Sequence, residues 1–243
     1  QIVDLKPNVT ERSANDLREV IKLLNAKLAQ ETDPAVKQDL EILIKSAAHN
    51  IKGDELSRKY DIPFFDMASL VYNGMRALLD DQVAAERRAA ALIRLRRYAG
   101  MEAGYEPITK LAEDRVRERL SIPGLYGPVK AEVERTLATE KFYLDGIGDL
   151  FKQYKIAGYE EAYAKLSSDV QAYNAFVKKE ILPRTREDFR LPPEEYSFAL
   201  EQVGVDIPPE KLSALARTAF TAIQARMQTV AAEVAKEKGY SSA

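Results

Sequence analysis

Residues 158–183 read GYEEAYAKLSSDVQAYNAFVKKEILP, and this stretch decides the fold class. Its apolar side chains recur every three or four positions, the spacing that aligns them along one face of an α-helix. They are Tyr159, Ala162, Leu166, Val170, Tyr173, Phe176, Val177 and Ile181. Gly158 precedes the stretch, and Pro183, which cannot continue a helix, stops it. The stretch therefore predicts a long amphipathic helix.

The same spacing extends along the chain in both directions, and no convincing stretch alternates apolar and polar residues with a period of two. We predict about nine helices, at residues 13–31, 34–56, 64–79, 83–98, 107–120, 128–151, 159–183, 196–203 and 208–239. Helix follows helix with no strands to cover. The sequence therefore predicts an all-α fold, a multi-helix bundle or array without a sheet.

Side chains that favour helix ends locate several of these boundaries. Ser13 can cap the first helix, and Asp33 before Pro34 is a cap followed by a proline in the first turn. Pro63 breaks the pattern after residue 62, because a residue before proline disfavours the helical region. Asp80 and Asp81 carry the negative charge that a new helix N-terminus favours, so we expect them at the start of the helix at 83–98.

The clearest loop is SIPGLYGP at residues 121–128, and a second irregular passage covers 184–193. No Gly/Ser linker divides the chain. A chain of 243 residues is long enough for one large domain or two small ones. We therefore predict a single helical domain over 1–243, and place any internal boundary at 121–128.

Composition limits the classes of partner. The chain has 38 acidic and 36 basic residues and a formal net charge of -2, which does not favour a nucleic acid as partner. No apolar run approaches the roughly 18–20 residues that span a bilayer, so no transmembrane helix is predicted. The absence of cysteine is compatible with either an exported or a cytosolic protein.

The residues needed for common hydrolytic chemistry are scarce. There is no cysteine, and His49 is the one histidine, whereas a His-Glu-x-x-His zinc helix needs two imidazoles on one face. A Ser-His-Asp relay could be built only around His49. We interpret His49 as a partly buried or surface helix residue. We therefore predict no catalytic, cofactor-binding or metal residue in this chain.

Four other patterns have structural interpretations that we prefer. Charged side chains on solvated helix faces explain the arginines, because acidic residues are interleaved with them at helical spacing. A weak point in a helix explains Asp145–Asp149, helix-dipole stabilisation explains Glu194 and Glu195, and packing with hydroxyls at the rim explains the tyrosines. The arginines are Arg87, Arg88, Arg94, Arg96, Arg97, Arg115, Arg117 and Arg119, and the tyrosines are Tyr159, Tyr163 and Tyr173.

A resemblance to a known family rests on an ordered series of short segments. In the second half they are Leu182–Arg184, Asp188–Leu191, Tyr196–Leu200, Gly204–Leu212 and Ile223–Met227. In the first half they are Asp39–Leu43, Pro63, Gly74–Leu79 and Arg94-Leu95. This order resembles the front portion of the bacterial family named domain of unknown function 885, and it covers essentially the whole chain.

The resemblance implies a function through the family's longer members. Their remaining half carries a His-Glu…His motif similar to that of zinc metallopeptidases, and many carry export or lipoprotein signals. By this resemblance the chain is the helical N-terminal region of a secreted or periplasmic, carboxypeptidase-like metallopeptidase. It would form part of a cleft for a peptide substrate, with zinc held in a C-terminal half that is its partner. Pro192 stands where members often have glycine, so no role is carried over to Arg190 or Tyr196.

The alternative is a free-standing, non-catalytic helical module that binds a protein or peptide in a groove. Saturable binding by this chain alone would favour the module. For an isolated half we expect exposed apolar surface where the other half docks, or self-association.

Overall fold

A computed structural model of the chain describes residues 2–240, and over these residues the fold is all-α, as predicted. Ten α-helices follow one another: α1 (Val9–Leu28), α2 (Pro34–Tyr60), α3 (Met67–Arg76), α4 (Ala85–Arg88), α5 (Ala90–Tyr98), α6 (Ile108–Leu120), α7 (Lys130–Gln153), α8 (Glu160–Phe176), α9 (Pro193–Gln202) and α10 (Pro209–Lys238). A π-helical segment, η1 (Val177–Ile181), and a 3-10 turn, η2 (Leu182–Arg184), continue α8. None of the helices in this part of the chain is both long and apolar enough to cross a bilayer.

The chain forms two compact units, residues 1–190 and 191–243. The first unit holds α1 to α8, and the predicted loop at 121–128 lies inside it. The second unit holds α9 and α10, and each begins at the second of two successive prolines, Pro193 and Pro209.

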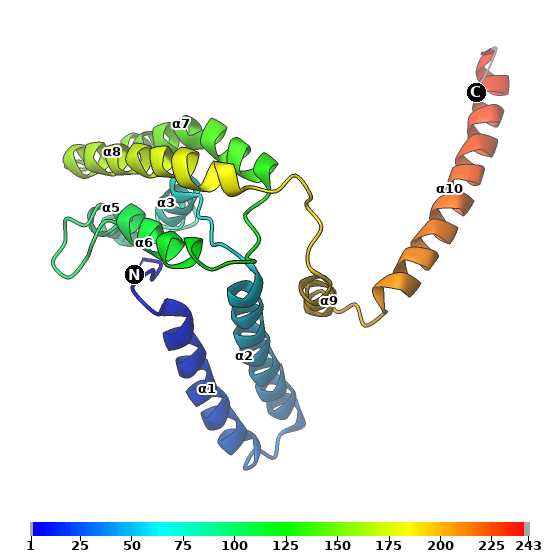
Figure 1. Ribbon diagram of the computed structural model, residues 1–243, viewed down its shortest axis with the longest axis horizontal. Coiled ribbons are helices and arrows are strands. Elements are labelled where there is room, and N and C mark those ends of the chain that lie inside the picture. The colour runs from blue at the N-terminus through cyan, green and yellow to red at the C-terminus, as the bar shows by residue number, and fades with distance from the viewer. Residues whose placement is uncertain (1, 241–243) are drawn as a thin grey trace. The chain divides into compact units, whose positions relative to one another are not determined.

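The hydrophobic core of the first unit lies among five helices. In Figure 1, α7 and α8 run side by side; α3 packs on α5 and α7, and α8 also packs on α5 and α6. Val71 of α3, Phe151 of α7 and Leu166 of α8 are each fully buried. The Phe151 ring stacks on Tyr159, with centroids 4.8 Å apart. The apolar stripe of residues 158–183 therefore faces this core.

Helices α1 and α2 form a separate hairpin of the first unit, visible in blue in Figure 1. The predicted cap of α2 is confirmed, since Asp33 Oδ1 accepts a hydrogen bond from the Ala35 N–H at 2.8 Å. The predicted start of α1 at Ser13 is wrong. The helix begins at Val9 because Asn8, at φ 55°, turns the chain in the left-handed region that asparagine tolerates.

Two predicted helices differ in detail from the structure. The helix expected at 83–98 is divided at Ala89 into the single turn α4 and the longer α5. The helix expected to weaken at residues 145–149 does not break. Gly146 and Gly148 lie inside α7, where an added β-carbon would approach Tyr72 and Tyr163 respectively, so the glycines allow tyrosine rings to pack on the helix.

The loop at 121–128 is held in place on both sides. Isolated parallel bridges join Asp61 to Tyr126 and Val129 to Arg186, and no longer ladder forms within residues 2–240. Gly127 lies between these bridges. A β-carbon there would overlap the Arg184 carbonyl oxygen and lie 2.8 Å from its carbon. Two passages that are distant in sequence are therefore in backbone contact at a residue without a side chain.

Candidate functional site

The residues that the sequence singles out lie on several different helices. His49 lies partly buried in the middle of α2, in agreement with its interpretation as a helix histidine. Glu194 and Glu195 occupy the first turn of α9, as expected. Asp145 of α7 forms an ion pair with Lys141 at 2.6 Å.

The interpretation of the arginines as solvated holds for some and is wrong for others. Arg117 forms the expected pair with Glu113, one turn away, at 2.6 Å. Arg115 is buried at 8% exposure, and its Nη1 donates to the Leu5 carbonyl oxygen at 2.8 Å. Arg94 donates from Nη1 to the Gly74 carbonyl oxygen at 2.7 Å. The Arg115 guanidinium joins α6 to the segment ahead of α1. The Arg94 guanidinium joins α5 to the end of α3.

The tyrosines are packing residues, with one correction. Tyr163 is partly buried, and its hydroxyl donates to the Leu144 carbonyl oxygen at 3.1 Å. Tyr173 is 1% exposed, so its hydroxyl lies in the core and not at the rim. Burial raises the pKa of Tyr173 because the phenolate form would lose its hydration.

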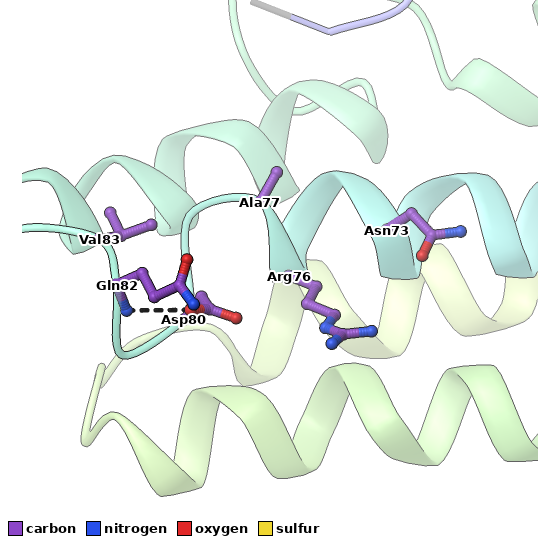
Figure 2. A pocket seen from close by; sticks show the side chains of 6 residues that line it. All are labelled: Asn73, Arg76, Ala77, Asp80, Gln82 and Val83. Atoms are coloured by element: carbon purple, nitrogen blue, oxygen red, sulfur yellow. Dashed lines mark hydrogen bonds between the residues drawn. The ribbon is translucent and has the colours of Figure 1, made fainter.

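A small pocket lies where α3 ends, and Figure 2 shows its lining side chains. It is a shallow, open depression of about 340 Å³, lined by Asn73, Arg76, Ala77, Asp80, Gln82 and Val83. The chain turns here because Leu78 and Leu79 both enter the core while the polar residues beyond them stay at the surface. Asp80 Oδ1 accepts a hydrogen bond from the Gln82 N–H at 2.9 Å and closes the turn.

The turn beside this pocket is fastened to two other helices. The Arg88 guanidinium of α4 lies over the Tyr154 ring at 4.7 Å and donates to the Asp80 carbonyl oxygen at 3.2 Å. The Tyr154 hydroxyl, at the end of α7, donates to Asp81 Oδ1 at 3.0 Å. Partial removal from water and this carboxylate together raise the pKa of Tyr154. The pocket wall is therefore a fixed structure.

The pocket offers polar groups for binding a ligand. Asn73 is oriented by its own hydrogen bond to Ser69 Oγ at 3.2 Å. Arg76 is exposed, and its guanidinium makes no hydrogen bond or ion pair with any other described residue. A free guanidinium beside two side-chain amides suits a carboxylate or a peptide backbone. Over residues 2–240 no group of three or more His, Cys, Asp or Glu side chains is placed to hold a metal ion.

The sequence does not reveal this pocket, because it assigns Asp80 and Asp81 to the start of a helix. That assignment is wrong, since α4 begins at Ala85 and the two carboxylates instead accept hydrogen bonds from Gln82 and Tyr154. An aspartate that accepts a hydrogen bond from the backbone N–H two residues later is typical of a side-chain-capped turn, and this is the signal that the sequence offers.

Comparison with known proteins identifies the family. The model of the family described as "Bacterial protein of unknown function (DUF885)" matches residues 1–243. The chain belongs to the DUF885 family. No curated protein and no solved structure matches it. Membership confirms the resemblance suggested by the sequence, and it extends over the pocket and both compact units.

One segment that carries the DUF885 resemblance contains a tight internal ion pair. Arg190 Nε lies 2.9 Å and 3.1 Å from the two carboxylate oxygens of Asp188, and its backbone N–H donates to the same group at 3.0 Å. These contacts lower the pKa of Asp188 to about 2. The Arg190 guanidinium is therefore occupied within its own segment.

The Arg190→Gln substitution is expected to raise the pKa of Asp188 towards the ordinary value of about 3.9, measured by carboxyl-carbon NMR titration. The lowered pKa means that ionised Asp188 stabilises the folded chain above about pH 4, and that this contribution disappears as the pH falls through about 2. Arg184→Gln, which removes no contact to Asp188, should leave the titration unchanged. An unchanged pKa in Arg190→Gln would show that the pair does not form in solution.

Proposed function

We propose that this DUF885 chain is the helical, non-catalytic N-terminal wall of a carboxypeptidase-like metallopeptidase. The observation that carries the proposal is the family match over residues 1–243, in a chain with one histidine and no cysteine. The described residues do not offer a ligand set that fits zinc. The zinc ligands would therefore come from residues outside this sequence, and this chain would contribute to holding the peptide.

The pocket at the end of α3 supplies the chemistry that such a wall needs. Arg76 can pair with a peptide carboxylate in bidentate fashion, and Asn73 and Gln82 can hydrogen-bond to peptide amides. The turn that carries Gln82 is fastened by Arg88 and Tyr154, so the backbone of this part of the pocket is held in position before a ligand arrives. The role of Arg76 in this proposal is to orient substrate, and the chemical step is left to the zinc-bearing half.

The test compares the isolated chain with the product of the reading frame continued past residue 243. We expect the longer product to bind zinc stoichiometrically and to cleave a peptide library in a chelator-sensitive manner, read by mass spectrometry. We expect the isolated chain to do neither. Cleavage by the isolated chain, or a stop codon directly after Ala243, would contradict the proposal. Saturable peptide binding by the isolated chain, with no cleavage by the longer product, would favour the binding module instead.

Substituting Arg76 tests its part in substrate binding. In the longer product, Arg76→Ala should raise the KM for peptides roughly tenfold, because a hydrogen bond to a charged group contributes about 1.5–3 kcal/mol. The zinc content should not change. Arg87→Ala is the matched control, because Arg87 is also exposed and lies outside the pocket. An equal effect of the two substitutions would remove the pocket from the proposal.

A further inference from the structure

Two opposite charges line the pocket at the end of α3 without pairing with each other. Arg76 is the last residue of α3, and Asp80 lies four residues later, in the turn. Arg76 forms no ion pair with Asp80 or with any other described residue. Figure 2 shows the two side chains apart, with Asp80 beside Gln82. The pocket therefore carries one positive and one negative group that are not engaged with each other.

The same spacing produces ion pairs elsewhere in the chain, because a continuous helix places side chains four positions apart on one face. These pairs are Lys110 with Asp114 at 2.9 Å, Lys141 with Asp145 at 2.6 Å and Lys165 with Asp169 at 2.6 Å. Helix α3 instead ends at Arg76, and Leu78 and Leu79 enter the core before the chain reaches Asp80. The end of the helix therefore separates the two charges that a longer helix would bring together.

Asp80 is held in place by its own turn. Its Oδ1 accepts a hydrogen bond from the Gln82 N–H at 2.9 Å. Its backbone carbonyl oxygen accepts from the Val83 N–H at 3.1 Å and from the Arg88 guanidinium at 3.2 Å. The second carboxylate oxygen, Oδ2, accepts no hydrogen bond from another described residue. Asp80 is therefore a positioned negative group with one oxygen available to a ligand.

We propose that this pocket binds a free α-amino acid, with the carboxylate of the ligand on Arg76 and its ammonium on Asp80 Oδ2. A zwitterion satisfies both charges at once, whereas a carboxylate alone would leave Asp80 unpaired. Ala77 and Val83 supply the apolar part of the lining for the ligand side chain. A volume of about 340 Å³ lies at the small end of ligand sites, which suits a single amino acid.

The inference rests on the proposed function for the origin of this amino acid, which is the residue released from the C-terminus of the peptide. In the bound peptide the nitrogen of that residue is a neutral amide. Hydrolysis transfers the water oxygen to the carbonyl carbon, which becomes a carboxylate, and both water protons to the nitrogen, which becomes an ammonium. Asp80 therefore gains an ion pair with the product that it lacks with the substrate. The released amino acid is expected to inhibit the reaction.

A ligand-observed NMR titration of the 243-residue chain with L-leucine tests the two charges separately. N-acetyl-L-leucine keeps only the carboxylate, and L-leucine amide keeps only the ammonium. Each analogue should bind roughly tenfold more weakly than L-leucine, because a hydrogen bond between charged groups is lost. Equal binding of N-acetyl-L-leucine and L-leucine, or no binding of L-leucine, would overturn the proposal. Tighter binding of the dipeptide leucyl-leucine, whose charges lie farther apart, would overturn the assignment to a free amino acid.

Substitutions assign each charge to its residue. Asp80→Asn should raise the dissociation constant of L-leucine roughly tenfold and change that of N-acetyl-L-leucine little, and Arg76→Gln should raise both. Asparagine can still accept the Gln82 N–H, so the turn is kept. Asp81→Asn is the matched control, because Asp81 lies outside the pocket lining and its replacement can still accept from Tyr154. Circular dichroism checks the folding of each variant. Equal losses for both ligands in Asp80→Asn, or an equal loss in Asp81→Asn, would overturn the proposal.

The longer product of the reading frame separates this inference from the proposed function. There Asp80→Asn should raise the inhibition constant of L-leucine roughly tenfold more than the KM of an N-acetylated peptide, because only the product carries the ammonium. An equal rise of the two constants would overturn the role of Asp80 in binding the product. Binding of L-leucine to the 243-residue chain, with no cleavage by the longer product, would contradict the proposed function and support the amino-acid site.

Discussion

Replacing Gly127 by alanine is expected to lower the free energy of unfolding by about 3 kcal/mol, at the upper end of the cost of overpacking. The added β-carbon would overlap the carbonyl oxygen of Arg184. Neither side can yield cheaply, because both are backbone. Moving them apart would stretch the hydrogen bonds Arg186 N–H to Pro128 O, at 3.0 Å, and Lys130 N–H to Arg186 O, at 2.9 Å.

Chemical denaturation followed by circular dichroism measures this loss. Gly124→Ala is the matched control, because it lies in the same loop with open space around its β-carbon position. Its φ of 82° alone should cost about 1 kcal/mol. Equal destabilisation by the two substitutions would mean that the close approach of the two backbone segments contributes nothing beyond the conformational preference of glycine.

The sequence predicts the helices because the residues that define each helix lie close to one another in the chain. The 158–183 stretch has enough apolar residues at helical spacing to define both the helix and its buried face. The same holds for the start of α2, where Asp33 and Pro34 act within a few residues of each other. Periodicity does not show that α8 continues as the π-helical segment η1 and then as the 3-10 turn η2, which contains Pro183.

Contacts that join distant parts of the chain are not predicted. Gly127 could be recognised as a loop glycine, but its neighbour Arg184 is 57 positions away. The acidic residues interleaved with Arg115 predict a solvated side chain, and Glu118 is its partner at 2.6 Å. What buries Arg115 is the segment around Leu5, 110 positions earlier. The spacing of residues along α6 does not show that a segment 110 positions earlier packs against this helix.

The candidate pocket was missed for a related reason. Its lining comes from the end of α3 and from the turn at residues 80–83, and the sequence pattern predicts a helix start at that turn. Arg76 has no distinguishing pattern in the sequence. It becomes a candidate because the other arginines nearby are engaged: Arg88 with the turn and Arg94 with α3. Arg76 is thus a candidate binding group because it has no partner among the described residues, and only the three-dimensional structure shows this.

The Arg115→Met substitution is expected to lower the free energy of unfolding by about 2–3 kcal/mol and to release the segment ahead of α1. The Arg115 side chain donates to Leu5 O and, from Nε and Nη2, to both carboxylate oxygens of Glu118. Methionine can fill the apolar part of the site, but leaves the carbonyl of Leu5 without its donor. An unsatisfied buried acceptor costs about 1–3 kcal/mol. The Glu118 pair adds little because that carboxylate is half exposed.

Denaturation and amide hydrogen exchange report the two effects separately. Exchange in the first turn of α1 should accelerate in Arg115→Met, since the hydrogen bond to Leu5 connects that end of the chain to α6. Lys110→Met is the matched control in the same helix. Its ion pairs with Glu106 and Asp114 are exposed, so its loss should cost less than about 1 kcal/mol. If both variants lost the same stability and α1 exchanged no faster, Arg115 would be an ordinary surface charge, and the segment ahead of α1 would be held by its apolar contacts alone.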